Sequence, residues 1–95
     1  MKAKRENTGE MYDRILRSKG LPGLGEHLVL GFEFEREELM YCFHYALMDS
    51  GADVAIFDGS GRRAVVVARP AENLKIRVAV EECGGKLYDV NLKTK

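Results

Sequence analysis

Two histidines and two cysteines are the side chains of this 95-residue chain best suited to metal binding or nucleophilic catalysis. His27 and His44 have no cysteine or carboxylate at a spacing that repeats, which a zinc site would require. Cys42 and His44 fall two positions apart in a predicted helix, so their side chains point about 200° apart and do not form a nucleophile–base pair. The sequence therefore predicts no metal site and no cofactor, and it predicts that Cys42 and Cys83 are reduced thiols.

Four glutamates lie where a predicted strand gives way to a predicted helix: Glu33, Glu35, Glu37 and Glu38. Carboxylates in the first turn of a helix compensate the helix dipole, and this explains Glu37 and Glu38 better than the other two. The same cluster is also suited to bind a divalent cation or to present an acidic surface to a basic protein. We favour dipole compensation, followed by the protein-binding surface.

A helix is predicted from Glu35 to Ser50, with Gly51 as its C-terminal cap. Its expected core stripe consists of Leu39, Cys42, Phe43, Ala46 and Leu47. About 180° from this stripe lie Glu37, Tyr41, His44 and Met48, with Met40 and Tyr45 on the flanks. An outer face with aromatic and methionine side chains indicates either cover by the first helix or N-terminal arm, or contact with a partner or a second copy of the chain.

The last forty residues carry a different set of charged side chains. Alternation along 74–81 predicts a strand that places Lys75 and Arg77 on one face, where they would form a cationic patch with Arg63 and Arg69. Segments 63–69, 74–81 and 85–91 resemble the C-terminal sheet of RelE-like ribonuclease toxins. In that family helices precede an antiparallel sheet, and Arg, Lys and a late Tyr act on RNA. By position, the resemblance implies RNA-acting roles for Arg63, Arg77, Lys86 and Tyr88.

The N-terminal half has strong local signals for three elements. Asn7 and Glu10 form a capping-box pattern before an apolar stripe, which predicts a helix from about Thr8 to Lys19. The glycine-rich segment 20–25 follows a helix instead of a strand, so we interpret it as a turning linker and not as a phosphate-binding loop. Alternation over 27–34 predicts a strand, in which Gly31 marks a bulge or a close backbone approach.

The C-terminal half is predicted to be a four-stranded antiparallel meander over 52–93, with strands near 53–58, 63–69, 74–81 and 86–93. The segment 58–61 has the composition of a hairpin turn. Arg63–Arg69 is apolar on both faces and is therefore expected to be a central strand. The predicted fold is α+β and two-layered, a helix-strand-helix unit followed by this meander, and the side of the sheet away from the long helix is either open or covered by the first helix.

Composition limits the class of protein. The chain is long enough for one domain over 1–95, with residues 1–6 expected to be a mobile tail. No apolar run approaches the roughly 18 residues of a membrane helix and no signal peptide is evident, so we expect a cytoplasmic protein that does not enter the membrane. Residues 21–61 carry one basic and eight acidic side chains, which excludes a wholly basic nucleic-acid binder.

These observations favour a small protein-interaction module, non-enzymatic and of the inhibitor, immunity or accessory type. Its partner, another protein or a second copy of the chain, would contact Glu33, Glu35, Glu37, Glu38, Tyr41, His44 and Met48. The alternative is a metal-independent ribonuclease or RNA-binding toxin that uses the cationic sheet. A small-ligand pocket between helix and sheet is a third, less specific hypothesis.

Overall fold

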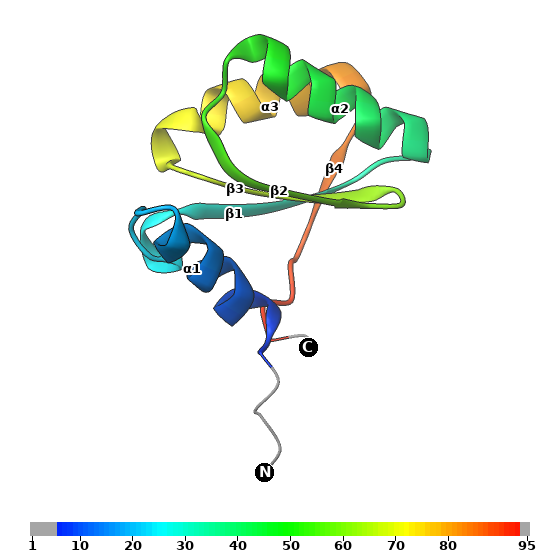
Figure 1. Cartoon of the computed structure of the whole chain (residues 1–95). Coiled ribbons are helices and arrows are strands. Elements are labelled where there is room, and N and C mark those ends of the chain that lie inside the picture. The colour runs from blue at the N-terminus through cyan, green and yellow to red at the C-terminus, as the bar shows by residue number, and fades with distance from the viewer. Residues whose placement is uncertain (1–5, 94–95) are drawn as a thin grey trace.

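The computed structural model describes residues 6–93, which form an α+β domain with a four-stranded antiparallel sheet (Figure 1). In chain order the helices and strands are α1 (Thr8–Ser18), β1 (Leu28–Glu33), α2 (Glu37–Ser50), β2 (Val54–Ser60), β3 (Arg63–Ala68), α3 (Asn73–Cys83) and β4 (Lys86–Tyr88). Short 3-10 helices, Leu24–Glu26 and Pro70–Glu72, precede β1 and α3. The predicted α+β class with its antiparallel sheet is confirmed.

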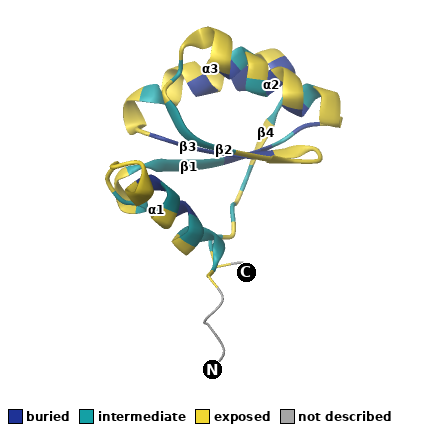
Figure 2. Cartoon of the chain, viewed as in Figure 1, coloured by how far each residue is buried: buried dark blue, intermediate teal, exposed yellow. Residues whose placement is uncertain are grey.

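The sheet has the strand order β2-β3-β1-β4, so β1 from the N-terminal half lies inside it. Leu28 pairs with Ala68 and Glu33 with Arg63 along β3, whereas Gly31 pairs with Tyr88 on β4. All of β3 beyond its first residue is buried, because helices cover both faces of the sheet where this strand runs (Figure 2). The expectation of a central strand here is confirmed.

α2 and α3 cover one face of the sheet and enclose the larger core. Phe43 of α2 lies at its centre, with ring centroids 5.4 Å from Phe32 and 5.3 Å from Phe34. Ile76 and Ala79 of α3 complete the cluster. Burial of this many apolar side chains is the main stabilising contribution to the fold, and they fill the space between the helices and the sheet.

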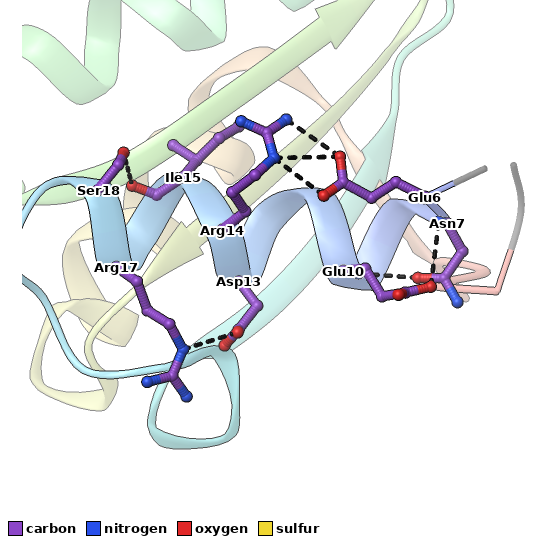
Figure 3. Close-up of polar contacts among 8 residues, drawn as sticks. All are labelled: Glu6, Asn7, Glu10, Asp13, Arg14, Ile15, Arg17 and Ser18. Atoms are coloured by element: carbon purple, nitrogen blue, oxygen red, sulfur yellow. Dashed lines mark hydrogen bonds and ion pairs between the residues drawn. The ribbon is translucent and has the colours of Figure 1, made fainter. Parts of the chain in front are cut away.

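α1 packs on the opposite face through the buried side chains of Tyr12 and Leu16. The predicted capping box is confirmed, since Asn7 Oδ1 accepts a hydrogen bond from the Glu10 amide and the Glu10 carboxylate accepts one from the Asn7 amide (Figure 3). The C-terminal segment runs past the start of α1, where the Gly9 amide donates to the Leu92 carbonyl oxygen at 2.7 Å. The first helix therefore covers part of the sheet and leaves α2 uncovered.

The strand predicted over 74–81 is wrong, because this segment is the helix α3. Ile76, Ala79, Val80 and Cys83 recur at helical spacing, and all four are buried. Gly84 ends the helix in the left-handed region with φ of 72°, as glycine commonly does at this position. The apolar sheet face needs a cover, and a helix at this position supplies it. The meander is therefore interrupted, and the fourth strand of the sheet is β1.

Three smaller expectations also change. The last strand is limited to β4, and its predicted continuation to 93 packs against α1 instead. A β-bulge between Val54 and Ile56 shifts the facing of β2, so that Val54 and Phe57 contact the α2–α3 side and Ile56 the α1 side. Of the predicted mobile tail, residues 1–5 lie outside the described residues, and Glu6 pairs with Arg14 at 2.9 Å (Figure 3).

Candidate functional site

The outward side of the helical layer carries a concentration of exposed apolar side chains, which we call the helical-layer surface. On α2, Tyr41, Tyr45 and Met48 recur at i, i+4 and i+7 and are 50%, 64% and 63% exposed. On α3, Leu74 and Val78 are 75% and 49% exposed. The outer faces of both helices are largely exposed in Figure 2. The helical period of 35–50 predicts the outward position of Tyr41 and Met48. It does not predict Leu74 and Val78 as part of this surface, because the sequence predicts a strand over 74–81 where the structure has α3.

A groove of about 240 Å³ runs between α2 and α3 and joins the two halves of this surface. Its lining residues are Ala46 and Ser50 from α2 and Leu74, Lys75, Val78, Ala79 and Glu82 from α3. A second recess continues along the same helices, where Cys42, Tyr45 and Asp49 face Glu82. The two hollows share Ala46, Ser50 and Glu82, so they adjoin one another between the helices.

The charges beside this surface are mostly negative. Glu35, Glu37, Glu38 and Asp49 are exposed along α2 and its N-terminal approach, with Arg36 as the one cation in 35–50. The Nε atom of Arg36 lies 3.9 Å from Glu38, and both side chains are largely exposed. An ion pair of this kind contributes little stability, so the carboxylates remain available to an external cation.

His44 does not stand free on the outer face as predicted. Its ring stacks on Phe57 with centroids 4.1 Å apart and planes 12° apart, which leaves the side chain half-buried. Met40, predicted on a flank, is buried beneath β2, with its sulfur within 2.9 Å of the position that a Cβ on Gly59 would occupy. The predicted core stripe is also shifted, since Cys42 is exposed.

Glu33 is separated from the other three glutamates of the predicted acidic cluster. Its side chain points to the α1 side of the sheet, where Glu33 Oε2 accepts a hydrogen bond from Arg63 Nε at 2.9 Å. This hydrogen bond and the positive charge of Arg63 lower the pKa of the Glu33 carboxyl. Glu33 therefore neutralises a cation of its own chain.

Three of the four residues implied by the toxin resemblance share one region of the sheet. The Arg63 guanidinium lies 4.6 Å from the centroid of the Tyr88 ring, and Lys86 is the register partner of Glu33. Arg77 lies elsewhere, on α3 across the sheet, and its Nε donates to Asn73 at 3.4 Å. The predicted patch of Arg63, Arg69, Lys75 and Arg77 on one sheet face does not form, because Lys75 and Arg77 belong to α3.

A buried tyrosine contact on the α1 side was not foreseen. The Tyr12 hydroxyl donates to Asp58 Oδ2 at 2.7 Å. Burial and this hydrogen bond raise the pKa of Tyr12 far above its usual range. The residues are 46 positions apart, so no local spacing signals the pair. Burial also raises the pKa of Tyr88 nearby.

Neither histidine has the surroundings of a metal ligand. The His27 ring contacts the Gly23 carbonyl oxygen through Nδ1 at 3.0 Å. Across residues 6–93, no three side chains of His, Cys, Asp or Glu gather closely enough to hold a metal ion. In the same range no helix combines the length and apolarity needed to cross a membrane.

Comparison of the chain with protein-family models, with curated proteins and with solved structures finds no match.

Proposed function

We propose that this protein is an interaction module that binds another protein through the helical-layer surface. The observation that carries the proposal is the cluster of Tyr41, Tyr45, Met48, Leu74 and Val78, which project from two helices on the same side of the domain. Tyrosine and methionine are enriched at protein interfaces. Scattered apolar residues on a surface are ordinary, whereas a contiguous group marks an interaction site.

The composition of α2 supports this function. A helix with one solvent-facing side ordinarily carries lysine and glutamate along that side, but Glu37–Ser50 contains no lysine or arginine. Phe43 and Leu47 fix the helix to the core, so Tyr41 and Tyr45 project from a rigid support. Binding then orders few groups on this side, which favours affinity.

Charge indicates the chemistry of the partner. Glu37, Glu38 and Asp49 border the apolar stripe of α2, and Glu82 borders the groove. The complementary ligand is a helical segment that is apolar along one side and carries lysine or arginine beside the apolar stripe. On α2 and α3 a second copy of the chain offers two cations, Lys75 and Arg77, against five carboxylates, Glu37, Glu38, Asp49, Glu81 and Glu82, so a different and more basic protein is the better fit.

The experiment is affinity capture with immobilised protein, followed by measurement of Kd for each purified partner. Tyr45→Ala combined with Leu74→Ser should weaken binding by at least about 100-fold, since aromatic anchors dominate interface energetics. Leu21→Ser is the matched control, because Leu21 is apolar and exposed but follows α1, away from this surface. Binding unchanged by the double variant, or a dimer of the chain alone in light scattering, would refute the proposal.

RNA binding on the α1 side of the sheet is a second candidate, favoured by the proximity of Arg63, Lys86 and Tyr88. Its support is weaker because Glu33 already pairs with Arg63. At low salt, Arg63→Ala should reduce RNA retention several-fold, and Arg77→Ala should have no effect because Arg77 lies on α3. Equal loss in both variants would exclude this site.

A further inference from the structure

The two cysteines of the chain meet where the C-terminal end of α3 packs against the middle of α2. Cys42 lies in α2 and Cys83 is the last residue of α3, and the Cys83 thiol contacts Cys42 Sγ at 3.1 Å. Cys42 is exposed and Cys83 is buried. A disulfide bond is about 2.05 Å long, so the two sulfurs are about 1 Å from bonding distance.

We propose that Cys42 and Cys83 form a covalent modification site at which a hydroperoxide oxidises the two thiols to an intramolecular disulfide that joins α2 to α3. The inference rests on the contact between the sulfurs and on their unequal exposure, and it does not depend on the proposed binding function. The sequence alone gave no sign of the pair, because 41 positions separate the two residues.

The reaction proceeds in two steps. The Cys42 thiolate attacks one oxygen of hydrogen peroxide, an S–O bond forms as the O–O bond breaks, and hydroxide leaves to become water, so that Cys42 is a sulfenic acid. The Cys83 sulfur then attacks the Cys42 sulfur. The S–S bond forms as the S–O bond breaks, and the departing hydroxide takes the Cys83 proton. Together the thiols lose two electrons and two protons, and one peroxide becomes two molecules of water.

The surroundings of the two sulfurs assign the order of reaction. Burial raises the pKa of Cys83 to about 12, and the contact with Cys42 acts in the same direction. Cys83 therefore stays protonated at neutral pH and is shielded from peroxide, which reacts with thiolates. Cys42 is the thiol that peroxide can reach, and Cys83 is the resolving partner.

The cross-link would lie beside the groove of the helical layer. Cys42 lines the recess that also contains Tyr45 and Glu82. If the helical-layer surface binds a partner as proposed above, the bond would hold the two walls of that recess at one separation. Oxidation would then alter partner affinity, a consequence that is separate from the formation of the bond.

The test is mass spectrometry of the reduced full-length chain after treatment with equimolar hydrogen peroxide. The expected product is a monomer lighter by about 2 Da, with tryptic peptides 37–62 and 78–86 joined, and it returns to the original mass with dithiothreitol. The thermal midpoint should rise by about 10 °C on oxidation. Cys42→Ser is the first variant, since an exposed position tolerates the change, and its remaining thiol should resist both peroxide and iodoacetamide.

In a second variant, Cys83→Ala, Cys42 should stop at the sulfenic acid, which dimedone traps, and without dimedone it should oxidise further to the sulfinic acid. A disulfide-linked dimer of the wild-type chain would overturn the proposal. So would stable sulfinic acid at Cys42 in the wild type, or recovery of both thiols unchanged. None of these readouts involves a partner, so failure here and failure of the proposed function are distinguishable.

Discussion

Gly31 leaves room for the aromatic ring that lies across the sheet. A Cβ at this position would fall 2.5 Å from Val90 Cγ2 and 2.9 Å from the Tyr88 ring, which are distances that real Cβ atoms do not adopt. The close approach expected from the sequence is therefore made by side chains of the C-terminal segment. The absence of a side chain at Gly31 lets the Tyr88 ring lie where the Arg63 guanidinium contacts it.

Gly31→Ala should lower the free energy of unfolding by about 1–3 kcal/mol, because the added methyl group forces Tyr88 and Val90 to move. Gly25→Ala is the control, since a Cβ there meets nothing within 4 Å. Urea denaturation of both variants measures the difference. Equal stability would show that the C-terminal segment adjusts freely.

Tyr12 makes stability sensitive to alkaline pH. Burial raises its pKa, as does the hydrogen bond to Asp58, and burial raises the pKa of Cys83 to about 12. Above about pH 9 the unfolded chain releases these protons before the folded chain does, so the folded state binds more protons and the free energy of unfolding falls as pH rises.

Urea denaturation at pH 8 and at pH 10.5 tests this dependence. Tyr12→Phe should lower stability by about 1 kcal/mol at pH 8, where a hydrogen bond is lost, and should make the further fall at pH 10.5 smaller. Tyr45→Phe is a control for an exposed hydroxyl. An unchanged pH slope in Tyr12→Phe would contradict the assignment.

At the scale of elements, α1 and α2 were predictable because their signals are local. Asn7 with Glu10 marks one start, and Gly51 marks one end in the left-handed region with φ of 73°. α3 was not predictable by the same means, since its sequence satisfies two periods. Leu74, Ile76, Val78 and Val80 alternate as in a strand, whereas Ile76, Ala79, Val80 and Cys83 recur as in a helix. The helix is favoured over the strand because the apolar face of the sheet needs a cover, and this tertiary requirement is not visible in the spacing of residues 74–83.

The same ambiguity explains the missed half of the candidate site. The groove between α2 and α3 forms only when 73–83 is helical, and Leu74 and Val78 line it only then. The positions of Tyr41 and Met48 followed from the period of α2 alone. His44 was misplaced because its cover is Phe57, a residue of β2, and packing between distant elements has no signature in the spacing of one helix.

Val78→Ala distinguishes helix from strand in solution. In an exposed helical position alanine is favoured over valine by about 0.5 kcal/mol, so the variant should be slightly more stable than the wild type. Val66→Ala in β3, where valine is fully buried, should lose about 2 kcal/mol. Thermal or urea unfolding measures both. A loss above about 1 kcal/mol for Val78→Ala would argue against the helix.

At the scale of the whole molecule, the sheet separates two apolar clusters of unequal size. The larger lies beneath α2 and α3, and the smaller holds α1 through Tyr12, Leu16, Val65 and Val67 with support from Leu92. A smaller cluster opens at lower free energy. α1 should therefore lose its amide protection before β3 does.

Leu92→Ser tests this division. The loss of its apolar contact should cost about 1–2 kcal/mol of local stability and speed hydrogen exchange in α1, with β3 little changed. Leu87→Ser provides the comparison, because Leu87 is another leucine of the C-terminal segment but is 53% exposed. Uniform acceleration across the chain would mean that the two clusters open as one.

The position of β1 inside the sheet has a consequence for synthesis on the ribosome. Leu28 pairs with Ala68, Gly31 pairs with Tyr88, and the Gly9 amide donates to the Leu92 carbonyl oxygen. In each pair the second residue is synthesised long after the first. Because the ribosomal exit tunnel encloses the most recently made residues, β1 can acquire its second neighbour only after β4 has left the tunnel. Until then the nascent domain exposes an apolar strand with one unpaired edge, which chaperones can bind.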